Sequence, residues 1–149
     1  MTADDYFAIQ NLIYRYCERI DRADFKGIGQ LFAHAAIYVP ALAEPVRGAE
    51  AVTAMYTQFT RVYPQSGTPR TRHVTSNVII EPDGEHAARA WSYVLVHQAT
   101  EALPLQPIIG GRYADRFAKV EGAWRFTERR MEMDLFGNLS AHLLQQFGP

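Results

Sequence analysis

Apolar residues in the first sixty positions recur at helical spacing. The pattern predicts a first helix from Thr2, a favourable N-cap followed by two acidic residues, to about Ala23. Its apolar stripe consists of Phe7, Ile9, Ile13, Tyr16, Cys17 and Ile20. A short second helix is expected to begin at Asp24, and a third to end at Pro64. The stripe of the third helix consists of Val52, Met55, Tyr56, Phe59 and Val62.

Strand-like segments dominate the second half of the chain. Four of them follow one another, separated by the turn signals PDGE, ALPLQP and VEG: residues 71–81, 86–99, 108–120 and 123–134. A brief strand, AIYV, precedes Pro40, and a short final helix is expected over about 139–147. Helices first and long antiparallel strands afterwards predict an α+β fold, with N-terminal helices covering one face of a curved sheet. Such a sheet curls into a cone-shaped barrel that encloses a cavity.

Composition narrows the classes of function. A length of 149 residues is that of one domain, 1–149, with room for a core and a ligand-sized cavity. A net charge of -1 gives no electrostatic footprint for nucleic acid or for an anionic membrane. The single cysteine fits a reducing compartment, and we find neither a signal peptide nor a membrane span in the sequence. We therefore expect a soluble, cytoplasmic protein whose partner is a small ligand.

Alternation along two adjacent predicted strands places polar and aromatic side chains on common faces. The first such face consists of His73, Thr75 and Asn77, and the second of Trp91, Tyr93, Leu95 and His97. Aromatic surface with a few polar groups is what a ligand pocket needs. We therefore expect Trp91, Tyr93 and Asn77, together with Tyr56 on the third helix, to bind substrate. For either histidine, a core imidazole bonded to a backbone carbonyl is the alternative.

Asp21, at the end of the first helix, lies close to the apolar stripe. It either caps the second helix or is a buried partner for an imidazole. In the second case the carboxylate would fix the tautomer of the ring and form a proton-transfer dyad.

The runs IYRYCERIDRADFKGIGQLFAHAAIYV, TRHVTSNVII, AWSYVLVHQ and GGRYADRFAKVEGAWRFTERRMEM together resemble one known family. It is the SnoaL-like polyketide cyclase branch of the nuclear transport factor 2-like superfamily, and the scytalone dehydratases in particular. The resemblance covers nearly the whole chain. It implies the cone-shaped α+β barrel, while the reaction stays open because this superfamily holds dehydratases, isomerases, cyclases and noncatalytic subunits.

The resemblance also implies roles for individual residues. The family's aspartate falls on Asp21, its early strand histidine on His73, its second histidine, paired with the aspartate, on His97, and a tyrosine on Tyr38. Where the dehydratases have a second tyrosine before the aspartate, this chain has Ile20, and GGRYADRF offers no counterpart for their serine and asparagine. The acid/base pair is thus retained while substrate recognition has changed.

These residues predict a cofactor-free acid/base enzyme acting on a small cyclic, mostly apolar carbonyl compound, by dehydration, isomerisation or cyclisation. His97 held by Asp21 would be the base, and Tyr38 or His73 would donate to the oxygen where charge develops. A noncatalytic module, similar to the β subunits of ring-hydroxylating dioxygenases, is the first alternative. A metal site built from His73, His97 and Asp21 is the second.

Three further expectations concern cofactors, one cross-strand pair and assembly. No glycine-rich phosphate loop joins a strand to a helix, and we expect neither a nucleotide nor a metal cofactor. Asp115 and Arg129, on the last two strands, are expected to pair across them. A homodimer, or a larger even assembly, is expected through the convex sheet face. The residues expected on that face are Ser92, Val94, Val96, Arg112, Ala114, Arg116 and Ala118.

Overall fold

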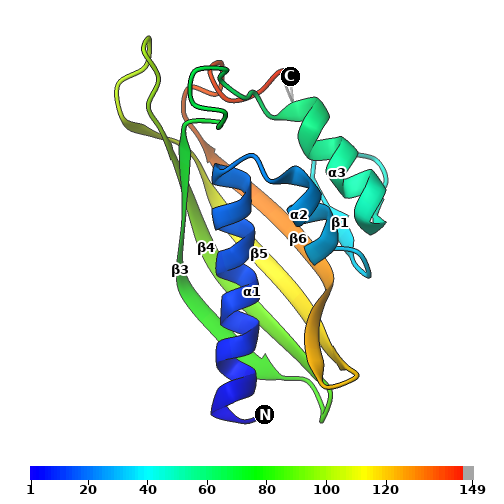
Figure 1. Ribbon diagram of the computed structural model, residues 1–149. Helices are drawn as coiled ribbons and strands as arrows, with labels where there is room; N and C mark the ends of the chain where they lie inside the picture. The colour runs from blue at the N-terminus through cyan, green and yellow to red at the C-terminus, as the bar shows by residue number, and fades with distance from the viewer. Residues whose placement is uncertain (146–149) are drawn as a thin grey trace.

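The computed structural model describes residues 1–145 of the chain. Three helices precede the long strands: α1 (Ala3–Asp21), α2 (Phe25–Leu31) and α3 (Gly48–Phe59). α1 lies across the concave face of the sheet, and α2 and α3 pack together beside it (Figure 1). The fold is therefore a curved sheet roofed by helices.

Six strands form one mixed sheet in the order β2-β1-β6-β5-β4-β3. Their bounds are β1 (Ala36–Tyr38), β2 (Val46–Arg47), β3 (Thr71–Pro82), β4 (Ala87–Gln98), β5 (Gln106–Val120) and β6 (Ala123–Phe136). β1 runs parallel to β6, and all other neighbours are antiparallel. β3 is an edge strand, which α1 contacts on its inner side.

The sheet curls where its ladders are interrupted. The register of β3 against β4 shifts between Ser76 and Ile79, and that of β5 against β6 shifts before Gly111. A Cβ atom at Gly111 would collide with the carbonyl oxygen of Glu132, so only glycine fits this close approach. Such irregularities bend the strands and increase their twist, and the inner face of the sheet becomes concave.

α1 is fixed at its start and along its apolar stripe. Thr2 Oγ1 accepts from the amide of Asp5 at 3.1 Å, and Asp5 Oδ2 accepts from the amide of Thr2 at 2.8 Å, which completes a capping box. Asp5 also accepts from Trp124 Nε1 at 2.8 Å and from Lys119 at 2.7 Å, which ties the helix start to the β5–β6 hairpin. The core between helix and sheet includes Ile9, Ile13, Cys17, Ile20, Val94, Val96, Phe117 and Phe126.

An ion pair is buried between β5 and β6. Asp115 and Arg129 are opposite one another in the ladder, and the guanidinium donates through Nε at 2.8 Å and Nη2 at 2.7 Å. The expected cross-strand pair is thus confirmed. The guanidinium also lies over the rings of Tyr113, at 4.0 Å, and Tyr16, at 4.4 Å. Burial lowers the pKa of Arg129, but the charge of Asp115 outweighs it and keeps the guanidinium protonated.

The predicted α+β fold with a mostly antiparallel sheet is confirmed, and the long strands fall close to their expected bounds. The predicted final helix is wrong for residues 139–145, which form a turn and an isolated bridge between Leu143 and Thr60. Here the amides of His142 and Leu143 both donate to the carbonyl of Leu139, which makes a single turn, and the backbone then bonds to Phe59 and Arg61 at the end of α3 and just after it. Residues 146 and 147 of that prediction lie outside the described residues. Within residues 1–145, no helix is long and apolar enough to cross a membrane.

Replacing Asp115 by alanine should leave Arg129 charged and buried without its partner. We expect Asp115→Ala to lower the free energy of unfolding by about 3–5 kcal/mol, measured by urea denaturation. The control is Asp83→Ala, which breaks an exposed pair with Arg116 at 3.6 Å and should change stability by less than about 1 kcal/mol. Equal losses in the two variants would contradict the central role of the buried pair.

Candidate functional site

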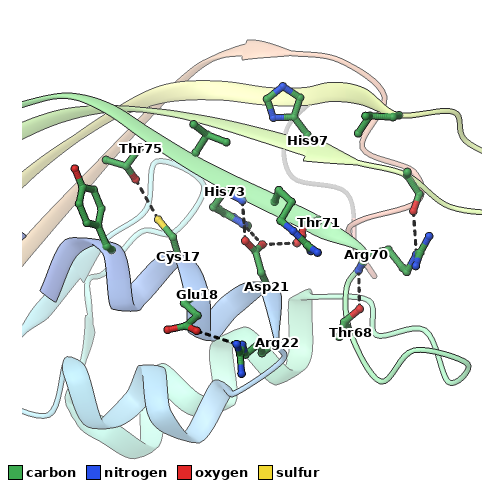
Figure 2. Close-up of a pocket in the computed structure, with 15 residues that line it drawn as sticks. Cys17, Glu18, Asp21, Arg22, Thr68, Arg70, Thr71, His73, Thr75 and His97 are labelled. Carbon is green, nitrogen blue, oxygen red and sulfur yellow. Dashed lines mark hydrogen bonds and ion pairs between the residues drawn. The ribbon is translucent and has the colours of Figure 1, made fainter. Parts of the chain in front are cut away.

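Asp21, the last residue of α1, is bound by three donors from the start of β3. The amide of His73 donates to Oδ2 at 2.9 Å, Thr71 Oγ1 donates to Oδ1 at 2.7 Å, and His73 Nδ1 lies 2.7 Å from Oδ1. Figure 2 shows the carboxylate between the helix and the strand, facing the imidazole. A carboxylate accepts only, so in the neutral ring the proton lies on Nδ1 and Nε2 is left as an acceptor.

The environment keeps Asp21 ionised. Burial by itself raises the pKa of this carboxyl group, but the hydrogen bonds and charge of His73, with the hydroxyl of Thr71, outweigh burial and lower the pKa. Both side chains of the pair are nearly enclosed. The pair therefore has a permanent negative charge behind the imidazole ring.

His97 is not part of this pair, and the predicted Asp21–His97 dyad is wrong. In the β3–β4 ladder His97 is opposite Arg72, whereas His73 is opposite Val96. Adjacent residues point to opposite faces of a sheet, so His97 lies on the outer face (Figure 2). It lines a groove of about 830 Å³ that follows the edge of β3 and also reaches Asp21 and His73.

His73 also lines a second cavity, of about 710 Å³, on the concave side of the sheet. This volume suits a small organic ligand. Its walls are mainly apolar and include Ile20, Val39, Leu42, Met55, Val96, Ile109, Met131, Met133, Phe136, Leu139 and Leu143. The polar side chains on these walls are Tyr16, Tyr56, Thr60, His73, Tyr113 and His142.

Three buried tyrosines form one wall of this cavity. The hydroxyls of Tyr16 and Tyr56 are 2.9 Å apart, and the ring of Tyr16 meets those of Tyr113 and His73 edge-on. Burial raises the pKa of all three phenols, and Arg129 opposes this only in part. They therefore stay protonated and can donate hydrogen bonds. The expected place of Tyr56 in the pocket agrees with this geometry.

Trp91 and Tyr93 do not face the cavity, contrary to expectation. On β4 the inner face carries small or aliphatic residues, and these two aromatic rings point outward, 40% and 48% exposed. Arg89 lies 5.6 Å from the ring of Trp91, and Arg112 lies 5.3 Å from that of Tyr93. Both faces of β4 are apolar in sequence, so alternation alone did not identify the inner one.

The predicted positions of Tyr38 and Asn77 in the pocket are also wrong. Tyr38 shares its ladder position with Arg130, whose guanidinium lies 3.9 Å from the tyrosine ring, while its neighbour Ile37 points into the core. Asn77 has a positive φ of 52° within the irregular part of β3 and is exposed. Neither residue lines the cavity.

The cavity contains four polar residues that sequence reasoning missed: Tyr16, Thr60, Tyr113 and His142. Tyr16 belongs to the apolar stripe of α1, and Tyr113 alternates with Asp115 and Phe117 on β5, so periodicity could have identified both. His142 had no such signal, because its position depends on how the segment after β6 folds back. Among the described residues, no three His, Cys, Asp or Glu side chains lie close enough together to bind a metal ion. In particular, His97 is on the outer face of the sheet and cannot join His73 and Asp21 in the metal site considered above.

Comparison with known proteins places this arrangement in a family. A model of the SnoaL-like domain matches residues 1–130. The chain belongs to the SnoaL-like family. Among the curated proteins, none matches it significantly. Solved structures that resemble it include proteins with a nuclear transport factor 2-like, cystatin-like fold, as the sequence resemblance implied.

Three of these structures illustrate the likeness. Rv3472 of Mycobacterium tuberculosis, of unknown function, is 28% identical, with a TM-score of 0.73 over 89% of this chain and 78% of its own. A protein of Novosphingobium aromaticivorans, provisionally assigned as a scytalone dehydratase, is 24% identical, with a TM-score of 0.69 over 89% and 86%. A Nostoc punctiforme protein of unknown function is 23% identical, with a TM-score of 0.73 over 90% and 94%. The latter two likenesses concern the fold alone.

His142 should make stability depend on pH. Burial, with the nearby charge of His73, lowers the pKa of His142 from 6.5 to about 4, although Asp21 opposes this. Below pH 6.5 the unfolded chain gains a proton there that the folded chain resists, so stability falls as the pH drops toward 4. His142→Asn should flatten the curve of unfolding free energy against pH in this window. Parallel curves for the two proteins would contradict the assignment.

Proposed function

We propose that this protein is a cofactor-free acid/base enzyme that removes a proton next to the carbonyl group of a small cyclic, mostly apolar compound. One observation carries the proposal: His73 is held by Asp21 through Nδ1 and borders an apolar cavity. No described residue is hydrogen-bonded to His73 Nε2, which leaves this nitrogen available as a base.

The proposed step needs only groups of this chain. His73 Nε2 takes the proton, the C–H bond breaks, and its electron pair moves toward the carbonyl oxygen. The imidazole gains a positive charge, which the adjacent carboxylate of Asp21 stabilises. A donor on the cavity wall then binds the oxygen that becomes negative. Dehydration, isomerisation and ring closure can each begin in this way.

The walls indicate the class of ligand. Methionine and branched aliphatic side chains, with the rings of Tyr56 and Phe136, give apolar surface for a carbon ring. Among residues 1–145, no lysine or arginine lines this cavity, so these walls provide no ion pair for a charged substituent. These features favour a neutral ring compound with one or two oxygen atoms. A noncatalytic module that binds the same kind of ligand is the competing function.

Exchange of hydrogen for deuterium tests the proposal without knowledge of the natural substrate. In D₂O, we expect the protein to accelerate deuterium incorporation at the carbon next to the carbonyl of 1-tetralone, followed by NMR. His73→Gln should reduce this rate by about 10²- to 10⁴-fold, because it removes the base. Asp21→Asn should reduce it less and leave binding largely intact, since the imidazole remains.

His97→Gln is the matched control, because it changes a histidine of the outer face and should leave the exchange rate unchanged. Loss of exchange in His97→Gln, with His73→Gln fully active, would identify His97 as the base and reject His73. Binding of 1-tetralone without any acceleration would favour the noncatalytic module.

We also propose a homodimer formed through the outer face of the sheet. Of the residues expected there, Ser92, Val94 and Val96 face the core instead. The four on β5, Arg112, Ala114, Arg116 and Ala118, alternate with the buried Tyr113, Asp115 and Phe117, as expected. The exposed apolar side chains of this face are Val74, Ile79, Trp91, Tyr93, Leu95 and Leu135. Val74, Leu95 and Leu135 occupy one row across the ladder, with Gly110 between the last two. A continuous apolar patch of this kind is typical of interfaces.

Two charges in this patch should prevent association. We expect the native protein to be a dimer at micromolar concentration by light scattering, and Tyr93→Glu combined with Leu95→Glu to give a monomer. The control, Val62→Glu, changes an exposed apolar residue in the connection after α3 and should leave the mass unchanged. A monomeric native protein would reject the proposal.

A further inference from the structure

The segment after β6 folds back over the cavity and is held there by main-chain bonds. The carbonyl of Ala141 accepts from Gln98 Nε2 at 3.0 Å and from the hydroxyl of Tyr63 at 2.6 Å. The amide of Arg61 donates to the carbonyl of His142 at 2.9 Å. These bonds come from the end of β4 and from the chain after α3. They fix the backbone on both sides of the His142 side chain.

The imidazole of His142 is buried but lacks partners among the described residues. The residue is 7% exposed, it lines the apolar cavity, and its ring centroid is 6.4 Å from that of His73. Its Nδ1 atom is enclosed with no hydrogen-bond partner, whereas Nε2 is not enclosed in this way. Buried polar groups are nearly always paired, so an unpaired imidazole beside the base requires an explanation.

The surroundings determine which nitrogen carries the proton. A proton on Nδ1 would be an enclosed N–H group without an acceptor, so the neutral ring keeps its proton on Nε2. The charge of a second proton is disfavoured by burial and by the nearby His73, and the pKa of His142 is accordingly lowered to about 4. Near neutral pH, His142 therefore presents one N–H donor and no charge.

We propose that the Nε2–H group of His142 binds the carbonyl oxygen of the ligand while His73 faces the adjacent carbon. The assignment rests on the proposed function and names the group that recognises the substrate. A neutral imidazole donor suits an oxygen that becomes negative, because it stabilises the charge without transferring its proton. The phenols of Tyr16 and Tyr56 are weaker candidates, since their hydroxyls bond to each other and only one of the two protons is left to donate.

A pair of ring compounds that differ only in the carbonyl group isolates this contact. The probes are 1-tetralone and tetralin, its hydrocarbon counterpart, and the readout is the ratio of their dissociation constants. In His142→Phe, which keeps a ring but removes the donor, the preference for 1-tetralone should fall by about 2- to 10-fold. His142→Gln, whose amide can reach a similar point, should retain much of it. The C=O stretching band of bound 1-tetralone should move toward its value in an apolar solvent in the phenylalanine variant.

These outcomes separate the inference from the proposed function. If the preference falls in His142→Phe but no protein form exchanges deuterium, recognition by His142 stands and the enzymatic proposal fails. An unchanged preference and an unchanged C=O band in a folded His142→Phe protein would overturn the inference, whatever the exchange rate. Loss of the preference in Tyr56→Phe, with His142→Phe like the native protein, would overturn it in favour of the phenol wall.

Discussion

The carboxylate of Asp21 both holds α1 against β3 and orients the imidazole of the candidate site. It is the last helical residue of α1, and the three donors that bind it belong to the first three residues of β3. This one carboxylate thus links the end of α1 to the edge strand β3 and also fixes the ring orientation and tautomer of His73. A shift of the helix end would remove both functions together, because no second side chain in the described part of the chain is hydrogen-bonded to the imidazole of His73.

Sequence periodicity predicted the first three helices and the four long strands because each has a distinct hydrophobic period and clear turn signals, but it failed for the final helix. It also identified Asp21 and His73, but paired the aspartate with His97. The difference lies in β4, where one face carries Trp91 and Tyr93 and the other carries valine, alanine and a buried glutamine. When both faces are apolar, alternation gives two equivalent answers, and the ladder register is needed to choose between them.

Two other features depended on contacts distant in the chain. The bulge near Asn77 breaks the alternation of β3, so counting in steps of two from His73 fails beyond Ser76. The turn that contains His142 is stabilised by partners more than 40 residues away, such as Gln98. Local propensity contains no information on either. By contrast, the Asp115–Arg129 pair could be expected because the two residues lie on neighbouring strands of one hairpin. Counting from the turn alone would pair Asp115 with Glu128, and the register shift between Arg116 and Phe117 places it opposite Arg129 instead.

The way in which the segment after β6 is attached bears on how such a cavity can diversify in evolution. Its position is set by carbonyl and amide groups of residues 141, 142 and 144, which every substitution other than proline would retain. The side chain at position 142 is thus free to vary while its backbone stays in place. A single codon change could replace the imidazole by another polar or apolar group at the same point of the wall. Position 142, which contacts the ligand in our proposal, can therefore change during evolution while Asp21 and His73, on α1 and β3, are conserved in place.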